Sequence, residues 1–264
     1  MNLGELKEFI EAISNKDQAG NSFTPEQFNL ILKQENLDLF NIECEKLKQL
    51  AQAKGQPFYK TYYNANNLNE FEVISTENIV GGKLLISTLN DYAYPITGIA
   101  MGYNGGDRKV DFDDDNEVSR RRTNLLTKPP YWYPMGVRKG DTLYFYPNDI
   151  ALLEFTYLKF PAEPNYDYCI RNSNYQKVYM PVGSNITAVG PIYNLYSSVG
   201  VLLAGNVLHL TATVYPYTST SIELEWAVNM HIKIAGLILS KMAVNLRDQE
   251  LQQYSLIEEK KQQT

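Results

Sequence analysis

Helical patterns stand on both sides of a middle region that cannot continue as helix, and this limits the folds open to the chain. Thr24, Pro25 and Gln27 make a strong helix start, with an N-cap residue, a proline in the first turn and a capping-box partner. An apolar stripe follows and runs to about Ala53, and Gly55 predicts the end of the helix. A helix of about 45 Å needs neighbours, either in its own subunit or in another.

The middle region, from about residue 57 to residue 226, is typical of β-structure. Gly and Pro separate short runs rich in Val, Ile, Thr and Tyr. Residues 151–160 are apolar on both faces, which predicts a central strand that ends at Pro161. Residues 221–226 alternate between apolar and acidic side chains, which predicts a last strand with one buried face. Tyr, at 20 of 264 residues, suits half-buried sheet faces and protein interfaces equally well.

Shorter helices are predicted at both ends. Asn2 and Glu5 form a capping box ahead of an apolar stripe, and Asn229 begins a helix after the β region. A final helix is expected over residues 249–261. The prediction is an α+β fold in which helical N- and C-terminal segments pack around or beside a mostly antiparallel β-sandwich or barrel. Its helical, β-rich and helical parts cover residues 1–56, 57–226 and 227–264.

Composition and charge disfavour several classes of protein. The net charge of −6 disfavours binding to nucleic acid or to anionic membranes, although an acidic surface can line a passage through which DNA slides. No apolar run is long enough to span a bilayer, and Met1 is not followed by the pattern of a secretory leader. Cys44 and Cys169 fit neither a disulfide framework nor a metal motif, so we expect a reducing compartment. No membrane partner is expected.

The acidic run over residues 111–117 is the strongest candidate for a metal site. It starts like a calcium loop, but Asn116 stands where such a loop needs Gly, and Arg122 where it needs a bidentate Glu. A solvated acidic loop followed by a short helix is therefore favoured. A metal-dependent hydrolase that uses residues 111–115 is the enzyme alternative.

Other catalytic patterns are missing from the sequence. The Gly-rich residues 102–108 lack the Lys of a phosphate-binding loop, which favours a hairpin or a loop tip. His209 and His231 have no partner residue at the spacing of a catalytic triad or a metal site. We therefore predict that the protein is not an enzyme and has no catalytic residue, no metal and no cofactor.

Arg120, Arg121 and Arg122 form the sharpest basic cluster. Three successive residues spread widely around a helix, so they cannot form one flat patch for DNA. One interpretation is a salt bridge to a neighbouring subunit, or contact with a passing phosphate backbone. The favoured alternative is pairing within the chain, with the acids of residues 113–117 on the adjacent turn.

Three groups of short motifs follow one another along the chain. They lie within residues 9–40 (Phe23-Thr24-Pro25-Glu26-Gln27-Phe28-Asn29), within residues 143–164 (Leu143-Tyr144-Phe145-Tyr146-Pro147, then 155–164) and within residues 223–254 (Glu223-Leu224-Glu225-Trp226, then 238–239 and 245–254). In this order they resemble a family of virion structural proteins from tailed phages of Bacteroidetes, including the crAss-like phages. The resemblance covers most of the chain but depends on short motifs.

That resemblance implies a ring or adaptor protein of the head–tail connector. Such proteins have helical bundles, a β-domain and a C-terminal segment that embraces a neighbour, and they form homo-oligomeric rings, commonly dodecamers. The implied partners are further copies of the chain, the portal and other tail or connector proteins, with DNA in the passage. The implied location is the virion, assembled in the host cytoplasm. The family contributes no catalytic residues.

The helical ends are the parts expected to join one subunit to the next. The candidate interface residues are Trp226, Leu239, Leu246, Leu251 and Tyr254. The alternative function is a β-domain binding module in another virion role, as a decoration or tail-associated protein that recognises a peptide, a glycan or another virion protein. A closed ring favours the connector, and a persistent monomer favours the binding module.

Overall fold

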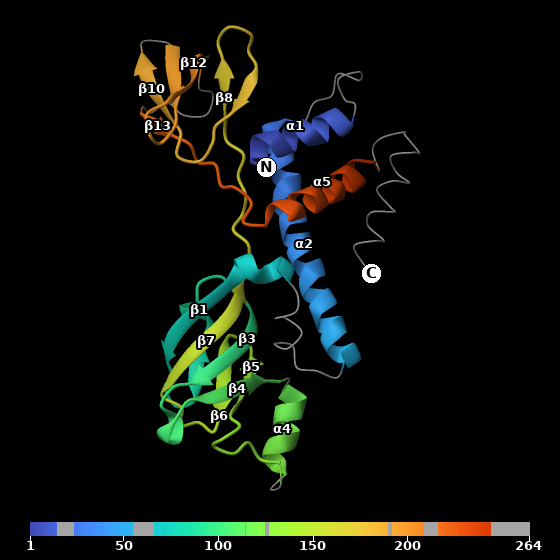
Figure 1. Ribbon diagram of the computed structural model, residues 1–264, viewed down its shortest axis with the longest axis vertical. Coiled ribbons are helices and arrows are strands. Elements are labelled where there is room, and N and C mark those ends of the chain that lie inside the picture. Colours follow the sequence, from blue (N-terminus) through green and yellow to red (C-terminus); the bar gives the residue numbers. More distant parts are fainter. Residues whose placement is uncertain are drawn as a thin grey trace. The chain divides into compact units, whose positions relative to one another are not determined.

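The computed structural model describes residues 1–14, 24–54, 66–113, 115–124, 127–189, 192–208 and 216–243 (Figure 1). Over these residues the chain is an α+β protein with two curled, mostly antiparallel sheets, which confirms the predicted fold class. It divides into two compact units: Met1–Ile42 with Pro161–Thr264 form unit 1, and Glu43–Phe160 form unit 2. These boundaries differ from the predicted divisions after residues 56 and 226.

The two N-terminal helices begin at the capping boxes that the sequence predicts. The Asn2 Oδ1 of α1 (Leu3–Ile13) accepts the Glu5 N–H at 2.8 Å, and the Glu5 carboxylate accepts the Asn2 N–H at 3.0 Å. Thr24 and Gln27 make the equivalent pair at the start of α2 (Pro25–Lys54), at 3.2 Å in each direction. Helix α5 (Val228–Ala243) packs against α1 in unit 1.

The sheet of unit 1 has six antiparallel strands in the order β13-β10-β11-β12-β8-β9. The bounds are β8 Tyr168–Arg171, β9 Lys177–Tyr179, β10 Asn185–Val189, β11 Ile192–Tyr196, β12 Leu202–Leu208 and β13 Tyr217–Thr218. A small core of mostly aliphatic side chains fills one face of this sheet: Cys169, Met180, Ile186, Leu195, Ala204 and Val207.

The sheet of unit 2 has seven strands in the order β1-β7-β3-β4-β5-β6-β2. The bounds are β1 Glu72–Asn78, β2 Lys83–Leu85, β3 Tyr92–Ala100, β4 Arg108–Phe112, β5 Met135–Lys139, β6 Thr142–Tyr146 and β7 Leu152–Lys159. Strand β7 lies between β1 and β3, which confirms the predicted central strand. Short 3-10 helices occur at Asn66–Phe71, Ile86–Thr88 and Tyr103–Gly105, the last within the β3–β4 hairpin that the Gly-rich residues predict.

One connection in unit 2 is parallel and carries a helix. Strands β4 and β5 pair in parallel, while the other ladders of this sheet are antiparallel. Helix α4 (Asp115–Thr123) lies in this crossover and packs on β5 (Figure 1). A parallel pair cannot be joined by a tight turn, so the crossover supplies room for a helix and for the loop that follows it.

The core of unit 2 is rich in aromatic rings. The ring of Phe155 on β7 lies 5.3 Å from Tyr157, 5.5 Å from Phe112 and 6.0 Å from Tyr92, measured between centroids. Phe155 is fully buried. Offset and tilted aromatic pairs of this kind add to the stabilisation that burial of apolar area provides.

The predicted strand over residues 221–226 is wrong, because only an isolated β-bridge forms there. The alternation has a different cause. The Glu223 carboxylate accepts the N–H of Leu3 at 2.9 Å, and the Glu225 carboxylate accepts the N–H of Ala162 at 3.0 Å. The acidic side chains therefore hold other segments of unit 1 instead of facing solvent along a ladder. The final helix predicted over residues 249–261 lies outside the described residues.

Candidate interaction surface

Helix α4 has a charge order that suits a helix of its length. Acidic side chains occupy its first turn and Arg120, Arg121 and Arg122 its last, so both ends match the helix dipole. One apolar residue, Val118, is buried and packs with Met135 and Val137 of β5 in a small separate core. This single anchor fixes which face of α4 meets the sheet and leaves its arginines at the periphery.

Two of the three arginines share one carboxylate. Arg120 reaches Glu117 at 2.8 Å and Arg121 reaches it at 2.7 Å, while Arg121 also lies 3.8 Å from Asp113. Hydrogen bonds from Arg120 and then Arg121 hold the pKa of Glu117 below its ordinary value. The predicted pairing within the chain is confirmed for these two residues. Contact with DNA or with another subunit stays a prediction.

Arg122 points to a different partner. Its guanidinium lies 4.1 Å from the centroid of the Tyr146 ring, and its Nη1 donates to the Tyr146 hydroxyl at 3.0 Å. At the start of the helix, Lys139 of β5 pairs with Asp115 at 2.6 Å, and this hydrogen bond lowers the pKa of Asp115. Arg122 therefore points away from the pair Arg120 and Arg121, so the three arginines do not form one flat patch.

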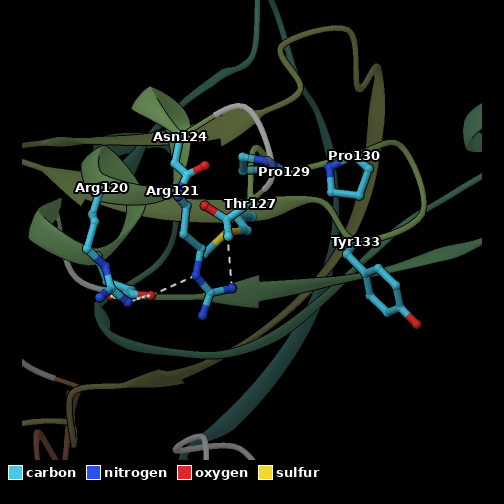
Figure 2. A pocket seen from close by; sticks show the side chains of 9 residues that line it. Arg120, Arg121, Asn124, Thr127, Pro129, Pro130 and Tyr133 are labelled. Atoms are coloured by element: carbon cyan, nitrogen blue, oxygen red, sulfur yellow. Dashed lines mark hydrogen bonds and ion pairs between the residues drawn. The ribbon is translucent and has the colours of Figure 1, made fainter.

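A hollow of about 510 Å³ opens between α4 and the loop that follows it (Figure 2). Arg120 and Arg121 lie at one end, and Pro130 and Tyr133 at the other (Figure 2). The lining residues are Glu117, Arg120, Arg121, Asn124, Thr127, Pro129, Pro130, Tyr133 and Met135. We call this the α4 hollow. It combines prolines and an aromatic ring with arginines whose charges Glu117 and Asp113 balance.

Three consecutive exposed aromatic residues follow Pro130, and the last of them, Tyr133, lines the α4 hollow. Tyr131, Trp132 and Tyr133 are 49%, 62% and 68% exposed. They form a turn closed by the Tyr133 N–H, which donates to the Pro130 carbonyl at 3.1 Å. We call these three residues the aromatic turn. Large aromatic side chains gain most from burial, so three in succession at the surface make this turn a candidate interaction site.

A second hollow, of about 320 Å³, is lined in part by Tyr131 of the aromatic turn. Tyr131 lies 6.1 Å from the Tyr103 ring, and the Tyr103 hydroxyl donates to Asp149 at 2.5 Å. Burial raises the pKa of Tyr103, and the bond to Asp149 raises it further. The aromatic turn thus contributes to both hollows, Tyr133 to the α4 hollow and Tyr131 to the second, where its ring lies near that of Tyr103.

The sequence interpretation overlooked the aromatic turn. Its signal is the string Pro129-Pro130-Tyr131-Trp132-Tyr133-Pro134. Prolines on both sides exclude a central strand or a helix interior. Consecutive aromatic residues in an extended segment also point to opposite faces, so one core could not bury all three. The tyrosine content of the whole chain does not show that three aromatic residues are consecutive here.

The predicted interface residues lie in unit 1 or outside the described residues. Trp226 is 3% exposed, and its Nε1–H donates to Asn36 Oδ1 on α2 at 2.7 Å. Leu239 on α5 is buried. Leu246, Leu251 and Tyr254 lie outside the described residues. Trp226 and Leu239 therefore pack within their own subunit, and a contact with a neighbour stays a prediction for all five.

The histidines and cysteines form no cluster within the described part of the chain. His231 of α5 is buried, with its Nε2 2.9 Å from the Trp226 carbonyl oxygen, and His209 lies outside the described residues. Burial raises the pKa of the thiols of Cys44 and Cys169 to about 12 and about 11, which keeps both protonated at neutral pH. Across the described ranges, no three His, Cys, Asp or Glu side chains are placed to hold a metal ion.

Comparisons with known proteins identify no family for the chain. No protein-family model matches the sequence, and a search of curated proteins finds no significant match. No helix among the described residues is long and apolar enough to cross a membrane.

Proposed function

We propose that this chain is a virion structural protein, one subunit of a homo-oligomeric ring in the head–tail connector of a tailed bacteriophage. In this role it joins the portal to the tail and surrounds the DNA passage. The observation that carries the assembly role is the exposure of the aromatic turn beside the α4 hollow. The sequence resemblance supplies the place of that assembly in the virion.

The residue types at this surface support a protein partner. Trp, Tyr and Arg are the residues that most often dominate the binding energy of protein interfaces. Here Trp132 and two tyrosines stand together with Arg120, whose side chain is 77% exposed. Because Glu117 pairs with Arg120 and Arg121, and Asp113 also lies beside Arg121, the surface offers little excess of positive charge to a nucleic acid. A folded polypeptide fits it better.

The ring is tested by the oligomeric state of the purified chain, alone and with the portal. Mass photometry and negative-stain microscopy should show closed rings, commonly of twelve copies in the family that the chain resembles. A monomer that persists at all concentrations and with the portal present would remove the ring. Binding to a virion component without self-assembly would instead favour the decoration or tail-associated role.

The aromatic turn is tested separately with Trp132→Ala. We expect assembly to weaken by at least about tenfold, because truncation of an interface tryptophan commonly costs 2 kcal/mol or more. Tyr175→Asn is the matched control: Tyr175 is 73% exposed in unit 1 and has a φ of 55°, which Asn tolerates. If both variants assemble like the unmodified chain, the aromatic turn is not part of the interface.

A further inference from the structure

Most of the sheet of unit 1 is built from a stretch of sequence that carries no charge. Between Val178 and Ile222 there is no Asp, Glu, Lys or Arg, although 20% of the whole chain is charged. The stretch includes β10, β11, β12 and β13. Soluble proteins keep exposed strands apart with charged side chains, and the buried centres of protein interfaces are where charges are depleted. A charge-free surface sheet is therefore a candidate interface.

The exposed apolar residues of this sheet gather at one hairpin. Val199 and Val201 in the β11–β12 turn are 81% and 57% exposed, and Leu202 and Leu203 at the start of β12 are 54% and 46% exposed. The neighbouring loop adds Val182, which is 54% exposed. We call these five residues the apolar tip.

The apolar tip has a defined shape. The Ser197 N–H donates to the Val201 carbonyl at 2.8 Å, and the Gly200 N–H donates to the Ser197 carbonyl at 3.0 Å. Gly200 has a φ of 80°, which favours glycine and lets the hairpin turn sharply. A Cβ on Gly183 would lie 3.0 Å from the Ser198 Cβ, so the loop that carries Val182 packs directly on the turn. The tip is an ordered projection with aliphatic side chains on its surface.

We propose that the apolar tip of one subunit packs into the α4 hollow and against the aromatic turn of a second copy of this chain. This inference rests on the proposed ring and identifies its contact. A ring is closed by a head-to-tail interface, which needs two different patches on each chain. The apolar tip belongs to unit 1 and the aromatic turn to unit 2, so each chain carries both halves.

The two surfaces suit each other in shape and in charge. The tip is a projecting hairpin and the hollow is a concavity of about 510 Å³. The tip has no charge, and Arg120 and Arg121 of the hollow have the carboxylates of Glu117 and Asp113 beside them, so docking would leave neither arginine without an acidic partner. Valine and leucine side chains against proline and tyrosine rings give the dense apolar contact found at interface centres.

The contact is tested by cross-linking two single-cysteine variants of the full chain with a short bis-maleimide. Ser198→Cys places a thiol in the turn of the tip, and Thr127→Cys places one in the hollow; both positions are exposed and neither change removes an apolar residue. The native thiols of Cys44 and Cys169 are buried. Thr76→Cys, at an exposed position of β1, replaces Thr127→Cys in the control mixture.

We expect the co-assembled Ser198→Cys and Thr127→Cys chains to give at least about tenfold more cross-linked dimer than the control mixture, because residues held in an interface meet at a high effective concentration. Equal yields from the two mixtures would overturn the contact. So would a dimer formed as readily by Ser198→Cys alone, since that result means tip-to-tip pairing. Rings that form without the cross-link would contradict this contact but not the proposed ring. A cross-link that forms without rings would support the contact and contradict the proposed ring.

Discussion

The two sheets of this protein are stabilised in different ways. Among the described residues, the sheet of unit 2 encloses 14 buried apolar residues, many of them aromatic, whereas the sheet of unit 1 encloses six that are mostly aliphatic. A sheet gains most of its stability from the apolar face that it buries. The sheet of unit 2 can therefore hold itself together, while the sheet of unit 1 needs support from other interactions.

Part of that support comes from a buried hydrogen-bond network at the base of the sheet of unit 1. The Asp167 carboxylate accepts the Tyr217 hydroxyl at 2.9 Å and the Thr220 N–H at 3.0 Å. The Ser221 hydroxyl accepts the Asp167 N–H at 3.0 Å and donates to the Met180 carbonyl at 2.6 Å. Buried polar groups that are fully paired fix a single arrangement of the chain. These hydrogen bonds thus add to the stability that the small apolar core of this sheet provides.

The distribution of charge along the strands also differs between the two sheets. Strands β1 and β2, at the two edges of the sheet of unit 2, carry Glu72, Glu77 and Lys83. Charged edge strands resist pairing with other chains. In unit 1 the edge strand β9 carries Lys177, whereas β12, which lies between β11 and β8, has no charge and pairs with β8 only at Val207 and Leu208 among the described residues. The difference suggests that the edge strands of the sheet of unit 2 stay unpaired with other chains, whereas β12 of unit 1 is suited to be covered on assembly.

Removing the central aromatic residue of unit 2 should have the largest effect. Phe155→Ala deletes a fully buried ring that contacts three other aromatic side chains, so we expect a loss of about 3–5 kcal/mol in the free energy of unfolding. Hydrogen exchange followed by mass spectrometry should show loss of protection in β1, β3 and β7. Protection lost equally in β10–β12 would show that the two sheets do not differ in self-sufficiency.

The equivalent deletion in unit 1 should cost less. Leu195→Ala removes a fully buried leucine, but few side chains pack around it because its core is small. We therefore expect a loss of about 2–3 kcal/mol in the free energy of unfolding, at the low end for such substitutions. Urea denaturation of the assembled and dissociated protein gives the measurement. Assembly should reduce the loss if a partner covers this sheet. A cost equal to that of Phe155→Ala would contradict the comparison.

Local signals in the sequence predicted much of this fold. The capping boxes at Asn2 and Thr24 predict where two helices begin, because a cap is satisfied by residues three positions away. The apolar run at 151–160 predicts β7 for a similar reason, since burial on both faces requires apolar residues at every position. The pairing of Arg120 and Arg121 with Glu117 also follows from helical spacing alone.

The features that could not be predicted from the sequence depend on contacts between residues that are distant along the chain. Periodicity cannot tell one large β region from two sheets, because strands of either kind alternate in the same way. The acids at Glu223 and Glu225 imitate a strand with a wet face, although their partners, Leu3 and Ala162, lie far away along the chain. The aromatic turn was missed because whether an aromatic residue is buried depends on its neighbours in space.

The hydrogen-bond network of unit 1 can be tested with a serine pair. Ser221→Ala removes a buried hydroxyl that serves two backbone groups, so we expect a loss of about 1–3 kcal/mol in the free energy of unfolding. Ser75→Ala in unit 2 is the control, because the Ser75 hydroxyl is buried with no hydrogen-bond partner among the described residues. Similar losses from both changes would show that the network does not support unit 1.

A fall in pH should distinguish unit 2 from unit 1, and this is the smallest of the expected effects. Asp115 and Glu117 of α4 have pKa values below their ordinary values of 3.8 and 4.5, because Lys139 and the pair Arg120 and Arg121, respectively, donate hydrogen bonds to them. The stability that they contribute is fully present above those ordinary values, and it is lost as pH falls through the lower values of the folded state.

Because Asp115 is exposed and Glu117 is partly exposed, solvent screens both carboxylates, so acid should loosen α4 without unfolding the sheet beneath it. Amide exchange, corrected for its intrinsic pH dependence and measured between about pH 6 and pH 3, should therefore show α4 losing protection while β10–β12 change little, since those strands contain no carboxylate that could titrate. Glu117→Gln should remove most of the response of α4. If that variant keeps the full response, the change arises from acids elsewhere and the pairing with Arg120 and Arg121 does not stabilise the helix.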